Sequence, residues 1–106
     1  MKSIPERDWK LLRRKRDDLL NRYCQRVNQT AERQLADDHA SAHTRYLHVY
    51  RHDREADDIL ATCFDDWRRS TAWMRLLALL KHDILTWADL REFSEETREV
   101  MAALHV

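Results

Sequence analysis

The 106-residue sequence contains no glycine and a single proline, Pro5. Glycine is the usual residue where a tight turn needs a positive φ, so a chain without it has few tight turns. Folds built from many short β-hairpins are therefore disfavoured. Good helix formers, among them Ala, Leu, Arg, Glu and Gln, supply much of the chain. We expect an all-α protein with one domain spanning residues 1–106.

Cysteine and long apolar runs are scarce as well. Cys24 and Cys63 are too few and too isolated for a disulfide framework or a zinc knuckle, and each falls on a predicted apolar helix face. No apolar run is longer than five residues, the length of the run at residues 76–80, and this is far too short to span a membrane. No apolar run near the N-terminus resembles a signal peptide, so we expect a cytoplasmic protein without a membrane partner.

Basic and acidic side chains balance at 19 each, but they are unevenly distributed along the chain. Residues 1–36 hold ten basic and five acidic side chains, whereas residues 37–69 hold five basic and eight acidic ones. We favour the interpretation that these segments form two helices that lie side by side and attract each other. A basic arm that binds nucleic acid is the alternative.

Apolar periodicity predicts a long first helix. Ser3 and Glu6 have the spacing of a capping box, with Pro5 in the first turn. No helix breaker precedes Asp37, so we expect a helix of about 30 residues. Its apolar face recurs at steps of three, four and seven through Trp9, Leu12, Leu19, Tyr23, Val27, Ala31 and Leu35.

A second helix is expected after a turn over residues 37–41, with Asp38 or Ser41 as its cap. It either continues to residue 81 or breaks near Ser70, and the sequence leaves both lengths open. Its apolar stripe comprises Tyr46, Tyr50, Leu60, Phe64 and Trp67 and weakens at Asp53 and Asp57.

Two short helices complete the predicted fold. Thr86 caps a helix over residues 87–93, which Leu85 and Leu90 close as a hydrophobic staple, and Ser94 caps the last helix. In a long antiparallel hairpin each helix has only one neighbour, so wide apolar stripes stay partly uncovered. We therefore expect two copies to form an antiparallel four-helix bundle around a two-fold axis.

Histidine is concentrated in one stretch. His39 and His43 are four residues apart, as are His48 and His52, and this spacing occurs in helical metal sites. The two pairs are about half a helical rotation apart, so a continuous helix directs them to opposite sides. Surface imidazoles are therefore the favoured interpretation. A metal-binding helical bundle that uses His48, His52 and Asp53 is an alternative.

An acidic run also lies on the predicted second helix. Asp53 and Asp57 fall near its apolar stripe, and Arg16 falls near the stripe of the first helix. We expect a partly buried ion pair between the two helices, which would favour their register more than their stability.

A basic run suggests a second kind of partner. Basic faces with interleaved aromatic residues suit nucleic acid. The balanced net charge and the adjacent Asp17 and Asp18 argue against this, so a solvated helix face is favoured. The run comprises Lys10, Arg13, Arg14, Lys15 and Arg16.

Four tryptophans are many for a chain of this length. Tryptophan is enriched at protein interfaces because one side chain buries a large area. Phe64, Trp67 and Trp73 are therefore our candidates for contacts with another protein, most simply a second copy.

Three stretches resemble a family of small bacterial proteins that have no known activity. They are ERDWK at residues 6–10, FDDWRRS at residues 64–70, and LTWADLREFSEETR at residues 85–98. The resemblance implies a bacterial, cytosolic protein and carries no functional residue with it.

No set of nucleophile, base and orienting residue can be assembled from the sequence, and a glycine-rich phosphate loop is impossible. We therefore expect no cofactor, and the sequence favours a non-enzymatic role while leaving catalysis open. The favoured function is a non-enzymatic, all-helical homodimer that acts through protein–protein contact.

Overall fold

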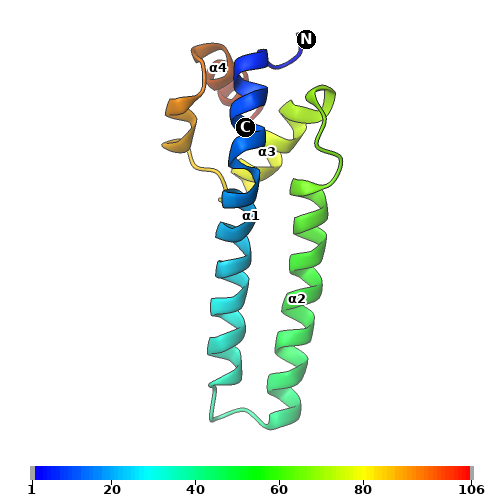
Figure 1. Cartoon of the computed structure of the whole chain (residues 1–106). Helices are drawn as coiled ribbons and strands as arrows, with labels where there is room; N and C mark the ends of the chain where they lie inside the picture. The colour runs from blue at the N-terminus through cyan, green and yellow to red at the C-terminus, as the bar shows by residue number, and fades with distance from the viewer. Residues whose placement is uncertain (1, 106) are drawn as a thin grey trace.

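The computed structural model describes residues 2–105, which form helices and short connections with no strand among them (Figure 1). Two long helices, α1 at Glu6–Leu35 and α2 at Ala42–Phe64, form an antiparallel hairpin. The prediction of an all-α fold built on a long hairpin is confirmed. The remaining elements are the 3₁₀ helix η1 at Arg69–Thr71, α3 at Ala72–Lys81, the 3₁₀ helix η2 at Asp89–Glu92 and α4 at Glu95–Leu104.

The hairpin has one covered half and one bare half. Helices α3 and α4 lie beside the N-terminal half of α1 and the C-terminal end of α2, and we call this part the head (Figure 1). The rest of the hairpin, residues 24–55, projects from it and is called the stalk (Figure 1). The molecule measures 52 × 26 × 24 Å. No residue between Tyr23 and Ala56 is buried, so the stalk lies outside the core.

The core of the head gathers apolar side chains from all the helices. Burying one Leu or Phe side chain contributes about 1.5–3 kcal/mol to folding, so this cluster dominates the stability of the head. Its largest fully buried apolar side chains are Ile4, Leu12, Leu19, Leu76, Leu79, Ile84, Leu85, Leu90, Phe93 and Met101.

Three predicted caps are confirmed. The Thr44 N–H donates to Ser41 Oγ over 3.1 Å at the start of α2, and Ser94 caps α4 in the same way. Thr86 caps the turn that leads into η2, whose own cap position is Ala88, and its bonds with Asp89 are reciprocal. The Thr86 N–H donates to Asp89 Oδ2 over 2.9 Å, and the Asp89 N–H donates to Thr86 Oγ1 over 3.1 Å. The helix expected over residues 87–93 is the shorter 3₁₀ helix η2.

The structure corrects the expected start of the first helix and decides where the second helix ends. The capping box at Ser3 is wrong, because Pro5 occupies the cap position of α1 and no side chain caps it. Of the two lengths left open for the second helix, the structure has the shorter one, since α2 ends at Phe64. Asp66 has a positive φ of 55°, which helical backbone cannot accommodate, and the break therefore precedes Ser70.

Asp83 takes the place of a glycine at the end of α3. The Ile84 N–H donates to Leu79 O over 2.9 Å, and the Asp83 N–H donates to Leu80 O over 3.1 Å. This is a Schellman motif, which requires a left-handed residue after the cap. Asp83 adopts φ 55° for this purpose, and Leu79 and Ile84 are both buried as the motif prefers.

We expect Asp83→Gly to stabilise the protein and Asp83→Val to destabilise it. The left-handed conformation costs a residue with a Cβ about 1 kcal/mol, most for a β-branched side chain and least for Asn or Asp. Urea unfolding followed by circular dichroism measures both shifts. Asp83→Asn is the matched control because it removes the charge and tolerates the same backbone. Equal stability of the Gly and Val variants would contradict this account.

Candidate functional site

Two of the five basic residues proposed for nucleic acid contact other elements of the head. Lys15 Nζ lies 3.0 Å from Glu92 Oε2. The guanidinium of Arg16 donates to Phe64 O over 3.4 Å and lies over the rings of Phe64 and Trp67, at 5.7 and 5.5 Å from their centroids. These two side chains therefore help to join α1 to the rest of the head.

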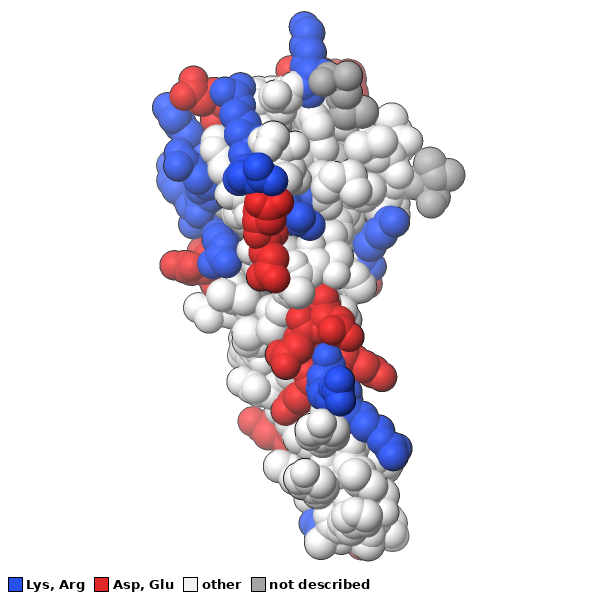
Figure 2. Space-filling view, turned by 90° about the vertical axis from the view of Figure 1, so that its right-hand side faces the viewer, with Lys and Arg blue, Asp and Glu red and all other residues white. Residues whose placement is uncertain are grey.

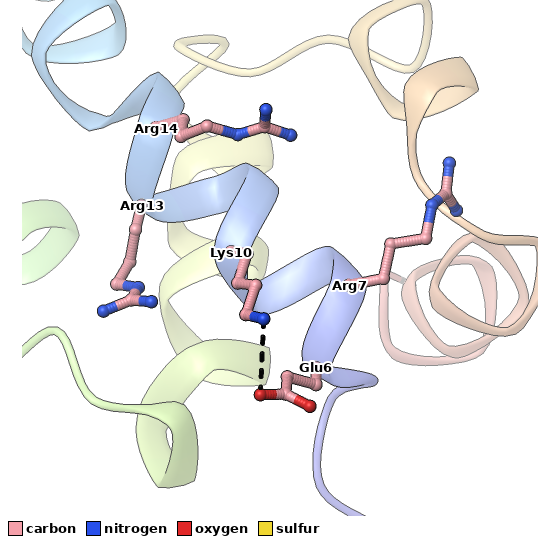
Figure 3. A pocket seen from close by; sticks show the side chains of 5 residues that line it. All are labelled: Glu6, Arg7, Lys10, Arg13 and Arg14. Carbon is pink, nitrogen blue, oxygen red and sulfur yellow. Dashed lines mark ion pairs between the residues drawn. The ribbon is translucent and has the colours of Figure 1, made fainter.

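The other three face outward. They line an open groove along the exposed side of α1, and their side chains spread away from one another (Figure 3). Within the groove Lys10 Nζ lies 3.6 Å from Glu6 Oε1, and both side chains are well exposed. The surface is therefore basic and open to solvent. Its lining comprises Glu6, Arg7, Lys10, Arg13 and Arg14.

The aromatic residues proposed for protein contact are tied to their own chain. Phe64 is buried and stacks on Trp67 with ring centroids 5.8 Å apart. The Trp67 Nε1–H donates to Cys63 O over 2.7 Å, and the Trp73 Nε1–H donates to Lys2 O over 2.8 Å. A contact of these residues with another protein stays a prediction.

The candidate metal ligands His48, His52 and Asp53 differ in their exposure along α2. His48 and Asp53 are exposed, whereas His52 is half-buried and lies one turn before the buried Ala56, on the covered side of α2. His39 lies in the turn that precedes α2. Among residues 2–105, no group of three or more His, Cys, Asp or Glu side chains is placed to hold a metal ion.

The expectation of an ion pair between α1 and α2 is wrong. No ion pair among residues 2–105 joins these helices. Asp53 and Asp57 are exposed, and Arg16 contacts Phe64 instead. The cations of α1 reach η2, where Arg22 Nη1 lies 2.7 Å from Asp89 Oδ2. The acidic side chains of α2 are left facing solvent.

A pair of exposed tyrosines marks the outer side of α2. Tyr46 and Phe64 are about five full turns apart and therefore lie on the same side of the helix. Phe64 is 5% exposed, whereas Tyr46 is 61% exposed. The sequence interpretation placed Tyr46 and Tyr50 on the core stripe. This is wrong because the head covers only the C-terminal end of α2.

The exposed tyrosines are ordered by contacts along the helix. Tyr46 and Tyr50 stack with centroids 6.2 Å apart and ring planes 16° apart. The Arg54 guanidinium lies 5.8 Å from the centroid of the Tyr50 ring, and its Nη1 donates to the Tyr50 hydroxyl over 3.4 Å. Aromatic and arginine side chains held in place on a surface are typical of binding hot spots.

Charged residues follow the tyrosines along the same surface. Leu47, Tyr50, Arg51, Arg54, Glu55 and Asp58 line a shallow groove on α2. None of its four charged residues forms an ion pair among residues 2–105. Charged side chains gather halfway along the molecule, above a largely uncharged tip (Figure 2). We call Tyr46 and these groove residues together the outer face of α2.

A buried carboxylate, which the sequence did not reveal, joins the two ends of the chain. Asp8 of α1 is fully buried. It accepts hydrogen bonds from the Ser94 N–H over 3.0 Å, from the Ser94 hydroxyl over 2.5 Å and from the Thr97 hydroxyl over 2.5 Å. Three donors satisfy its charge at the N-terminus of α4, where the helix dipole favours an anion.

These contacts set the acidity of Asp8. Burial acts to raise the pKa of its carboxyl group, but the hydrogen bonds from Ser94 and Thr97, together with the Arg7 guanidinium 3.6 Å away, outweigh that effect. The pKa of Asp8 is therefore lowered from its usual value of 3.8. With all its oxygens engaged in capping, Asp8 serves the fold and is not arranged as a catalytic base.

Comparisons with known proteins give no family for the chain. No family model, curated protein or solved structure matches it. The resemblance to small bacterial proteins therefore stays a prediction. Within residues 2–105, none of the helices has the length and apolar character that crossing a bilayer requires.

We expect Asp8→Asn to lower the free energy of unfolding at neutral pH by about 2 kcal/mol or more, because charge-assisted hydrogen bonds are lost in a buried site. A depressed native pKa stabilises the fold above the unfolded pKa and loses that effect as pH falls through the native pKa. The difference between wild type and Asp8→Asn should therefore narrow below about pH 4 in urea titrations.

Asp18→Asn is the matched control because Asp18 is exposed on the same helix. Its effect should stay within about 0.5 kcal/mol at every pH. If the free energies of unfolding of Asp8→Asn and wild type differed by the same amount at every pH, the role of the Asp8 charge would be contradicted.

Proposed function

We propose that this protein is a non-enzymatic interaction module that works as a homodimer, and that the outer face of α2 is its contact surface. The observation that carries the proposal is the exposed, stacked pair Tyr46 and Tyr50 on a helix whose same side is buried in the head at Phe64. Apolar surface that continues from a core onto an uncovered helix is typical of association sites.

The stalk gives this surface the shape of an interaction site. It projects from the head as a bare two-helix hairpin, so the outer face of α2 is open to a partner along its length (Figure 1). Leu35, which is 54% exposed at the end of α1, extends the apolar area at the tip. A second hairpin packed here would complete the four-helix arrangement that the apolar stripes of the sequence favour.

Nucleic-acid binding is a second candidate, and the basic groove on α1 favours it. The groove faces away from the core and presents the side chains of Arg7, Lys10, Arg13 and Arg14 over about two turns of helix. Such a row of cations can contact consecutive phosphates.

The dimer is tested by the mass of the untagged protein in multi-angle light scattering and native mass spectrometry. We expect twice the chain mass of 12.9 kDa. Changing Tyr46 and Tyr50 together to Ser should give the monomer mass with unchanged helical content, because the apolar contact is lost. Trp87→Ser is the control, since Trp87 is 47% exposed and lies on the head. A wild-type protein that is monomeric at high micromolar concentration would overturn the proposal.

The nucleic-acid candidate is tested by fluorescence anisotropy with a labelled DNA duplex across a salt series. If the groove binds phosphate, changing Lys10, Arg13 and Arg14 to Ala should weaken binding and reduce the salt slope by about one for each lost contact. The control changes three other exposed cations, Arg33, Lys81 and Arg91, to Ala and keeps the same net charge. Equal losses in both variants, or no binding by the wild type, would remove this candidate.

A further inference from the structure

We infer that two copies of the chain pair antiparallel through the outer face of α2, with the two-fold axis passing between Arg54 and Glu55. This inference rests on the proposed homodimer and specifies which residues meet in it. A two-fold interface uses the same surface on both subunits, so that surface has to be complementary to itself. The charges on the outer face of α2 have this property.

The sign of the charge changes once along the groove. Arg51 and Arg54 precede the midpoint, and Glu55 and Asp58 follow it. When two such helices run antiparallel about that midpoint, residues equally far from the axis face each other. Arg54 then lies level with the partner's Glu55, and Arg51 lies level with the partner's Asp58, so each pairing of opposite charges occurs twice.

Other arrangements of the same surface lose these pairs. In a parallel pairing Arg51 would face the partner's Arg51, and Asp58 would face the partner's Asp58, so every close charge pair would repel. Shifting the antiparallel register by one helical turn sets Arg51 and Arg54 against the partner's cations in one direction, and Glu55 and Asp58 against the partner's anions in the other. The charge pattern therefore selects one direction and one register.

The same register brings together apolar groups that each chain leaves exposed or half-buried. Leu47 becomes level with Thr62 of the partner subunit, at the opposite end of the helix. In each chain Thr62 borders a groove that Met74, Leu77 and Ala78 also line, and Met74 is 60% exposed. The tip of one stalk thus reaches the uncovered apolar edge of α3 in the other copy.

A second copy fits this surface better than an unrelated protein does. The four charged residues have no ion-pair partner among residues 2–105, and the surface that complements them is the surface itself. Leu47 and Tyr50 lie in the same groove and supply the apolar contact that exposed ion pairs alone do not provide.

The test reverses the charges in two halves and then recombines them. One variant carries Arg51→Glu and Arg54→Glu, and the other carries Glu55→Arg and Asp58→Arg. Each alone places like charges across the axis, and we expect its dimer Kd to rise at least about ten-fold in sedimentation equilibrium. Mixed in equal amounts, the two variants should form a heterodimer that native mass spectrometry identifies by its mass.

The control reverses two exposed charges outside the surface, Arg91→Glu and Asp18→Arg, and should keep the wild-type Kd. Circular dichroism checks that every variant remains helical, which Glu and Arg both favour. A monomeric wild type would overturn the homodimer itself. A dimeric wild type whose single-sign variants stay dimeric, or fail to recombine on mixing, would overturn only the register proposed for α2.

Discussion

A buried negative charge determines how the head is assembled. A carboxylate withdrawn from water needs hydrogen-bond donors around it. The contact of Asp8 with Ser94 joins the beginning of α1 to the last helix, with more than 80 residues of chain between them. Because Ser94 caps α4 and also donates to Asp8, the helix start and the long-range contact depend on each other. Helix α3 and η2 belong to the stretch of chain that this contact closes.

In this chain without glycine, arginine side chains donate hydrogen bonds to backbone carbonyl groups at and just beyond helix ends. Helix C-termini leave carbonyl groups without intrahelical donors. Arg26 donates over 2.9 Å to the carbonyl of His82, the cap residue of α3, and over 2.7 Å to Asp83 O just beyond it, and Arg22 donates over 2.8 Å to Ile84 O in the segment that follows. The basic character of α1 is explained in part by these contacts. Its cations bind the segments that follow α3, and none forms an ion pair with α2 among residues 2–105.

Most signals that act over a few residues were predictable, with the capping box at Ser3 as the exception, whereas contacts between distant segments were not. The caps at Ser41, Thr86 and Ser94 follow from residue type and spacing, and the structure has all three. Tyr46 shows the limit, because its position on the helix matches that of Phe64. Whether such a residue is buried depends on which segments lie beside it, and periodicity within one helix does not contain that information. Asp8 was hidden for the same reason, since its donors are at the other end of the sequence.

The division into head and stalk implies two levels of local stability within one hairpin. Amide hydrogens near Leu12 and Leu19 are protected by the buried core, and their exchange with solvent requires opening of the head. In the stalk, helix hydrogen bonds are supported only by partly exposed contacts between two helices. These hydrogen bonds therefore open in local fluctuations that leave the core intact. The tip of the hairpin is therefore the first part of the isolated chain to unfold. The affinity of a partner that binds the tip therefore includes the cost of ordering the tip.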